Sequence, residues 1–306
     1  MSNLPEDFAT SVEVEAALKS NQPIVALEST VITHGLPRPE NLKLALALEE
    51  EVRNTGATPA TIAVLSGKVR VGMNPDEIKE LANMGGVRKI SRRDFAGAVA
   101  AKASGGTTVA GSLVVADKIG IKTFATGGIG GVHRQIPYDV SADLPQLAAS
   151  PVIVVCAGVK SILNLPATLE YLETIGVPVI GYQTDEFPAF YSRESGLPVS
   201  ESVKSFEEIA QIAVIHWRLG IAGAILVTVS PPNKYALPKK EIDGFIDAAL
   251  MEAEKNNIRG QALTPYLLQK VNDLSLGKSL QANLALLKNN ARIGAQIAIA
   301  LNKMLD

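Results

Sequence analysis

The stretch that decides the fold class is Val152-Ile153-Val154-Val155-Cys156, followed by Ala157-Gly158-Val159-Lys160-Ser161. The first five residues are all apolar, a run with the length and character of a strand that is buried on both faces of a sheet. Short runs of this kind recur along the chain. Between several of them apolar residues repeat three or four apart, which is the period of a helix. This alternation of strands and helices favours a largely parallel sheet of the α/β class.

The other elements follow from the same two patterns. Strands are expected at 24–27, 61–65, 123–125, 152–156, 177–181 and 224–229, and helices at 41–54, 168–175 and 206–219. From Lys239 onward the pattern is almost wholly helical, most strongly at 241–256 and 280–305, so this end is expected to pack over the sheet. We expect one domain over residues 1–306, because no low-complexity linker, charge block or internal repeat divides the chain.

Composition argues against several classes of protein. Hydrophobic residues make up 47% of the chain and charged residues 20%, and the net charge of −2 provides no bulk field to attract nucleic acid or a membrane surface. The single cysteine, Cys156, lies in an apolar run, so it is expected to be buried and cannot form an internal disulfide. Because the start is not signal-like and no apolar run approaches the roughly 18 residues that span a bilayer, we expect a cytoplasmic protein.

Polar residues just after the strands are the candidate site, because ligands bind at the carboxyl ends of parallel strands. Glu28 directly follows the strand at 24–27 and is itself followed by Ser29-Thr30. A carboxylate in this place can act as a general acid, and the alternatives are a helix cap or a buried ion pair. His34, a few residues later, is interpreted as structural.

A short basic run is the second candidate. Residues 87–94 read Val-Arg-Lys-Ile-Ser-Arg-Arg-Asp, with four cations within six residues. The run is either a phosphate site or a solvated face. If it forms a strand, Lys89 and Ser91 share one face.

A glycine-rich loop follows the strand at 123–125. It reads Thr126-Gly127-Gly128-Ile129-Gly130-Gly131-Val132-His133-Arg134, which matches neither a Walker A loop nor a dinucleotide-binding fingerprint. Glycines in such a loop let backbone amides approach an anion, and a mere flexible connection is the alternative.

Two carboxylates four residues apart come next. Asp143 or Ser141 is placed to cap a short helix at 144–148, whereas Asp139 has no such simple task. A carboxylate beside an anion-binding loop often holds Mg²⁺ or Mn²⁺ through oxygen ligands and waters. Without a cluster of cysteine and histidine, a zinc site is not expected.

Lys160 lies four residues beyond the end of the strand at 152–156. A buried or cation-flanked lysine loses its proton more readily, and the neutral amine attacks a carbonyl carbon to form a Schiff base. The alternative is a lysine at a helix start whose stem is buried and whose ammonium reaches water. His216 and Trp217 are interpreted as packing residues.

The chain resembles the pseudouridine-5'-phosphate glycosidase family. The resemblance rests on five motifs that occur in the same order: those around Glu28, at 91–94, at 126–134, at 141–143 and around Lys160. The similarity covers about residues 21–290 and includes Gly181-Tyr182-Gln183-Thr184 and Leu280-Gln281-Ala282-Asn283. The resemblance implies an α/β/α sandwich with a helical C-terminal part, a homotrimer and a divalent cation, Mn²⁺ or another such as Mg²⁺.

The resemblance also assigns residues. It implies that Lys160 is the covalent nucleophile, Glu28 the proton donor and Asp139 the metal ligand. The remaining assignments are Lys89 and Val109 as substrate contacts, Ser141, Ala142 and Asp143 as the substrate-contacting stretch, and Thr126, His133 and Asn283 as pocket residues. The segment Gln135-Ile136-Pro137-Tyr138 is shorter than that of the family and lacks its acidic residue, so the surroundings of the metal are expected to differ.

The activity that the resemblance implies is reversible cleavage of the carbon-carbon glycosidic bond of pseudouridine 5'-phosphate to uracil and ribose 5-phosphate. Because carbon is a poor leaving group, cleavage needs a lysine amine on C1' that becomes a Schiff base and a proton for C5, which Lys160 and Glu28 would supply. An aldolase that acts on a sugar phosphate would use Lys160 similarly. A catalytically silent ligand-binding module is the alternative from another class.

Overall fold

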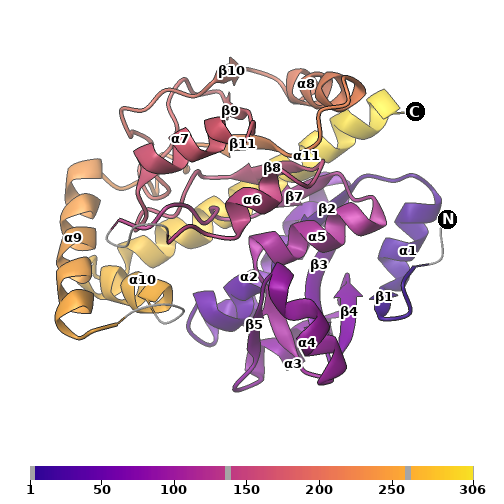
Figure 1. Ribbon diagram of the computed structural model, residues 1–306, viewed down its shortest axis with the longest axis horizontal. Coiled ribbons are helices and arrows are strands. Elements are labelled where there is room, and N and C mark those ends of the chain that lie inside the picture. The colour runs from indigo at the N-terminus through magenta and orange to yellow at the C-terminus, as the bar shows by residue number, and fades with distance from the viewer. Residues whose placement is uncertain (1–3, 135–138, 259–262, 306) are drawn as a thin grey trace.

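The computed structural model describes residues 4–134, 139–258 and 263–305 and contains a mixed, largely parallel sheet with helices on both faces (Figure 1). The main strand order is β1-β4-β3-β2-β7-β8-β11-β9-β10, and β6 pairs with both β3 and β5. The strands are β1 Phe8–Thr10, β2 Ile24–Leu27, β3 Thr58–Leu65, β4 Lys68–Val71, β5 Arg88–Ile90, β6 Gly105–Thr107, β7 Thr123–Ala125, β8 Ile153–Cys156, β9 Val179–Tyr182, β10 Glu201–Val203 and β11 Ile225–Val229.

Helices form the two outer layers. In Figure 1, α5, α6 and α7 lie in front of the central strands and α11 runs behind them. The helices are α1 Val12–Lys19, α2 Glu40–Thr55, α3 Pro75–Asn83, α4 Phe95–Ala100, α5 Val109–Ile119, α6 Asp143–Leu147, α7 Leu165–Thr174, α8 Phe206–Arg218, α9 Lys239–Lys255, α10 Leu263–Leu274 and α11 Lys278–Leu305, with a π-helical turn at Val31–Gly35 and a 3-10 turn at Arg92–Asp94. The predicted α/β/α arrangement with a helical C-terminal part is confirmed.

The six strands expected from apolar runs are all present. Four of them, β2, β7, β8 and β11, are central in the sheet, and every residue of β8 is fully buried. Cys156, at the end of β8, is a buried free thiol, as predicted. Burial on both faces explains why these strands read as continuous apolar runs.

The antiparallel part of the sheet was not expected. β4 pairs with β3 through the two-residue turn Ser66-Gly67, whose φ angles are 49° and 78°. Positive φ at both turn positions suits the right-handed twist of a hairpin, and a glycine adopts it without strain. The unexpected strands β1, β5, β6 and β10 have three residues each, too few to show a period.

The C-terminal helix α11 covers the centre of the sheet. It packs against β2, β7 and β8 and against the helices α2 and α8. A Cβ built on Gly294 would lie 3.2 Å from Cβ of Ala125 and 3.5 Å from Cγ1 of Val25, so the helix lies directly on these strands. None of the helices in the described part of the chain is long and apolar enough to cross a membrane. The single domain over residues 1–306 stays a prediction.

Candidate active site

Glu28 is the first residue after β2 and is 7% exposed. Both of its carboxylate oxygens have a hydroxyl partner: Thr126 donates to Oε1 and Thr30 donates to Oε2. Thr126 directly follows β7, the strand beside β2, and is 2% exposed. The ends of two adjacent strands therefore fix a buried carboxyl group at the carboxyl edge of the sheet.

Lys160 lies in the loop between β8 and α7, not at a helix start. Its backbone N–H donates to the carbonyl of Ile129 at 3.1 Å, and its own carbonyl accepts from Leu163 N at 2.9 Å. Arg134 tightens this loop by donating to the carbonyls of Ser161 at 2.9 Å and Leu163 at 3.1 Å. The half-buried lysine is therefore held on an ordered loop at the carboxyl edge of the sheet.

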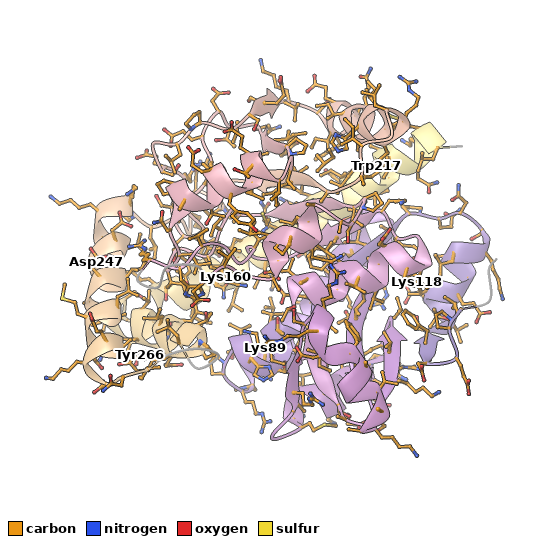
Figure 2. All side chains as sticks on the ribbon, in the orientation of Figure 1. Lys89, Lys118, Lys160, Trp217, Asp247 and Tyr266 are labelled. Atoms are coloured by element: carbon orange, nitrogen blue, oxygen red, sulfur yellow. The ribbon has the colours of Figure 1, made fainter. Side chains whose placement is uncertain are left out.

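Lys89, on β5, lies in the same site as Lys160, and both are near the centre of the view in Figure 2. Burial, and after it the charge of Lys160, lower the pKa of Lys89, while Asp143 and Glu28 oppose this shift. The half-buried Lys89 therefore interacts electrostatically with Lys160, Asp143 and Glu28.

The basic run divides between the site and solvent. Lys89 is half-buried, whereas Arg88, Arg92 and Arg93 are exposed. Ser91 does not continue the strand but begins the 3-10 turn at Arg92–Asp94, and its N–H donates to the Asp94 carboxylate at 2.9 Å. One cation of the run therefore lies in the site and three lie at the surface, while the phosphate site itself stays a prediction.

The Asp143 side chain does not cap its own helix, α6. Asp143 is the first residue of α6, and its buried carboxylate accepts from Ala110 N at 2.9 Å and from Gly130 N at 2.8 Å. This ties the start of α5 to the glycine-rich loop. Ser141 supports it by accepting from Asp143 N at 3.2 Å. Asp143 thus organises the backbone around Lys89.

The glycine-rich loop is packed rather than open. A Cβ on Gly130 would lie 2.1 Å from Oγ of Ser141, so only glycine fits there. The amide of Gly130 donates to Asp143, and that of Ile129 donates to the Gly158 carbonyl at 3.1 Å. These two amides are therefore engaged within the protein, and the expected cradle of backbone amides for an anion does not include them.

The other predicted contacts are distributed around this centre. Val109, 1% exposed, is the first residue of α5, whereas Ala142 is exposed just before α6. His133 lies near the end of the glycine-rich loop, and its backbone N–H donates to the Asp139 carbonyl at 2.9 Å. Residues 135–138, where the sequence departs from the family, lie outside the described residues.

The predicted metal ligand has few partners. The Asp139 side chain is 39% exposed, and its Oδ2 lies 3.9 Å from Nδ1 of His133. In residues 4–134, 139–258 and 263–305, no three His, Cys, Asp or Glu side chains come together as a metal-binding group. A single exposed carboxylate does not suit a closed protein cage, but it suits a cation that keeps most of its waters, as Mg²⁺ and similar ions do.

Asn283 lies in a cavity of about 220 Å³ between the π-helical turn, α10 and α11. His34 lines the same cavity, and burial followed by the charge of Lys89 lowers the pKa of His34, so its imidazole stays neutral at neutral pH. His34 therefore lies between the cavity and Lys89, a position that the sequence analysis did not assign to it. Thr30 was also missed, although it stands two residues after Glu28.

Comparison with known proteins identifies the family. The family model described as indigoidine synthase A like protein matches residues 13–300. Proteins named pseudouridine-5'-phosphate glycosidase are 51% identical in Caldanaerobacter subterraneus subsp. tengcongensis, over 96% of each chain, and 49% identical in Staphylococcus aureus, over the full length of both.

Two solved structures share the fold. The prealnumycin C-glycosynthase AlnA in complex with ribulose 5-phosphate matches with a TM-score of 0.91 and 38% identity over 99% of both chains. An indigoidine synthase A-like protein from Thermotoga maritima matches with a TM-score of 0.88 and 34% identity over 96% of both. Since the family model and the curated relatives all extend over nearly the whole sequence, the chain belongs to the pseudouridine-5'-phosphate glycosidase family.

Proposed function

We propose that this protein reversibly cleaves the carbon-carbon glycosidic bond of pseudouridine 5'-phosphate, giving uracil and ribose 5-phosphate. The single observation that carries the proposal is the meeting of Glu28, Lys89 and Lys160 at one edge of the sheet. It brings an acid, an amine and a second cation together, which is the set that this reaction requires. The names of relatives about half identical to the chain point the same way.

The first step opens the sugar ring. The neutral amine of Lys160 attacks C1', and the ring oxygen O4' leaves with a proton as an alcohol. Nitrogen is now bonded to C1', which still carries the uracil ring through C5. A neutral amine is needed for this attack, because an ammonium nitrogen has no lone pair to give to C1'.

The second step breaks the carbon-carbon bond. Glu28 gives its proton to C5 of uracil. The electrons of the C1'–C5 bond return to the uracil ring, and the nitrogen lone pair forms the C1'=N iminium. Water then hydrolyses the iminium, which releases ribose 5-phosphate and regenerates Lys160, while Glu28 recovers a proton. The sum is one substrate and one water converted to uracil and ribose 5-phosphate.

Binding assignments complete the proposal. The uracil ring would lie in the cavity that Asn283 and His34 line, and the positive field of Lys89 would attract the 5'-phosphate. The rest of the substrate pocket would be lined by Val109, Thr126, His133, Ser141, Ala142 and Asp143. A C-glycosynthase with this fold was solved in complex with a sugar phosphate, ribulose 5-phosphate. This complex supports a sugar phosphate as the class of ligand.

We also propose that Asp139 anchors a hydrated Mn²⁺ or Mg²⁺. Such a cation would neutralise negative charge on the substrate. The homotrimer and the cytoplasmic location rest on the family resemblance and on composition. Sedimentation velocity of the purified protein would test the trimer directly.

The reaction is tested by incubating the protein with pseudouridine 5'-phosphate and Mn²⁺ and following free uracil by chromatography. We expect uracil release that EDTA suppresses and Mn²⁺ restores, and a weaker response to Mn²⁺ in Asp139→Asn. The exposed Asp185→Asn is the matched control. Absence of uracil with the wild-type protein would overturn the proposal. Turnover of another sugar phosphate instead would favour the aldolase, and binding without turnover the ligand-binding module.

A further inference from the structure

Asn290 is a buried polar residue in the middle of α11. It is 1% exposed, and between Ala282 and Leu301, a stretch that the structure describes throughout, it is the one buried residue of the helix that is not apolar or glycine. Its Nδ2 donates to the carbonyl of Thr126 at 2.8 Å and also lies 3.4 Å from the carbonyl of Gly127. The C-terminal helix therefore holds the first residues after β7.

The amide of Asn290 is only half satisfied. Its Oδ1 is buried and has no hydrogen-bond partner. An unpaired buried acceptor costs stability, and an apolar side chain of the same size would remove it, although the Thr126 carbonyl would then lose its donor. The stability of the helix does not explain this residue, whereas the carbonyl groups that it binds do.

These carbonyl groups belong to the backbone that positions the acid. The Thr126 hydroxyl donates to Oε1 of Glu28. The helix also lies against the next residue, since a Cβ on Gly127 would be 3.1 Å from Cδ2 of Leu287. A continuous set of contacts therefore leads from α11 through Asn290 and Thr126 to Glu28.

We propose that Asn290 is a positioning residue for proton transfer by Glu28, an inference that rests on the proposed function. By holding the Thr126 carbonyl, Asn290 fixes the direction of the Thr126 hydroxyl. That hydroxyl, together with Thr30, fixes the rotamer in which Glu28 presents its proton to C5 of uracil. The seating of the C-terminal helix on the sheet is thereby coupled to catalysis.

The first test uses two substitutions of Asn290 and one neighbour. Asn290→Leu keeps the size of the side chain, removes the unpaired Oδ1 and also removes the donor to the Thr126 carbonyl. These two effects oppose each other, so we expect a melting temperature within a few degrees of the wild type. We expect its kcat to fall about tenfold, with KM within twofold, because a displaced acid affects chemistry more than binding. Asn290→Ala should lower kcat similarly. The control is Asn289→Ala, at the residue before Asn290. The half-buried Asn289 side chain accepts a hydrogen bond from Arg292, and its removal should leave kcat unchanged.

A double-mutant cycle with Thr126→Val separates positioning from general packing. If Asn290 acts through Thr126, Asn290→Leu should lower kcat in the wild type but cause no further loss in Thr126→Val. Equal losses in both backgrounds, or an unchanged kcat in Asn290→Leu, would overturn the inference. Uracil release by the wild type in the same assay keeps a failure of this inference apart from a failure of the proposed function.

Discussion

Lys89 and Lys160, 71 positions apart in the sequence, place two amines in one partly buried site. Burial and the charge of Lys160 both lower the pKa of Lys89, and part of this is offset by Asp143 and Glu28. Burial therefore disfavours the charged form of Lys89, and keeping this lysine in the site costs stability.

The substitution Lys89→Met tests what Lys89 costs in stability and what it contributes to the reaction rate. Because burial disfavours the charged form of Lys89, the substitution should raise the melting temperature by about 2 °C. Uracil release should fall about 100-fold, since the site loses the lysine that is proposed to attract the 5'-phosphate of the substrate. Thermal unfolding and initial rates check both effects.

The sign of the pH effect follows from linkage. Because the folded pKa of Lys89 lies below its ordinary value of 10.5, the unfolded state binds more protons between the two values. Lys89 should therefore make the free energy of unfolding of the wild type increase with pH across this window. Lys89→Met should lack this increase. Urea unfolding at pH 7 and pH 9.5 measures the difference, and an identical rise in both proteins would refute it.

Glu28→Gln should lower kcat by 10²–10⁴-fold, because an amide has no proton to give to C5. Thr30→Val, which removes one of the two hydroxyls on the Glu28 carboxyl group, should lower kcat about tenfold. Steady-state kinetics on pseudouridine 5'-phosphate measure both. Full activity in Glu28→Gln would remove this residue from the mechanism.

Asp143→Asn should destabilise the protein by about 2 kcal/mol. The carboxylate accepts from two backbone N–H groups, and an amide offers only one oxygen, which leaves one N–H facing an NH₂ group. Urea unfolding, with the exposed Asp185→Asn as the control, measures the loss. Equal midpoints for the two variants would show that Asp143 does not hold the backbone in the way described.

The sequence predicted the central sheet because its strands are buried on both faces. β2 and β8 read as unbroken apolar runs, and the carboxyl-end rule then selected Glu28 and Lys160 from residue types alone. β4 carried a weaker signal, the Ser66-Gly67 turn, which marks a hairpin only once its flanking strands are recognised. Three-residue strands such as β5 have no readable period.

Long-range contacts explain what the sequence did not predict. Lys89 stands on β5, outside the main strand order, so its approach to Lys160 followed only from the family resemblance. The partners of Asp143 are backbone amides, which no side-chain pattern reveals. For the same reason Asn290, which reaches back across 164 positions to Thr126, could not be selected from its helix.

The central claim is that Lys160 bonds to C1' of the sugar, and reductive trapping tests it most directly. Pseudouridine 5'-phosphate is added to the protein with sodium borohydride, and digested peptides are analysed by mass spectrometry. We predict a reduced ribose-phosphate adduct on Lys160 in the wild type, none on any lysine in Lys160→Ala, and at least about 10⁴-fold less uracil from that variant. Uracil release by the wild type with no adduct, or with the adduct on Lys89, would contradict the account.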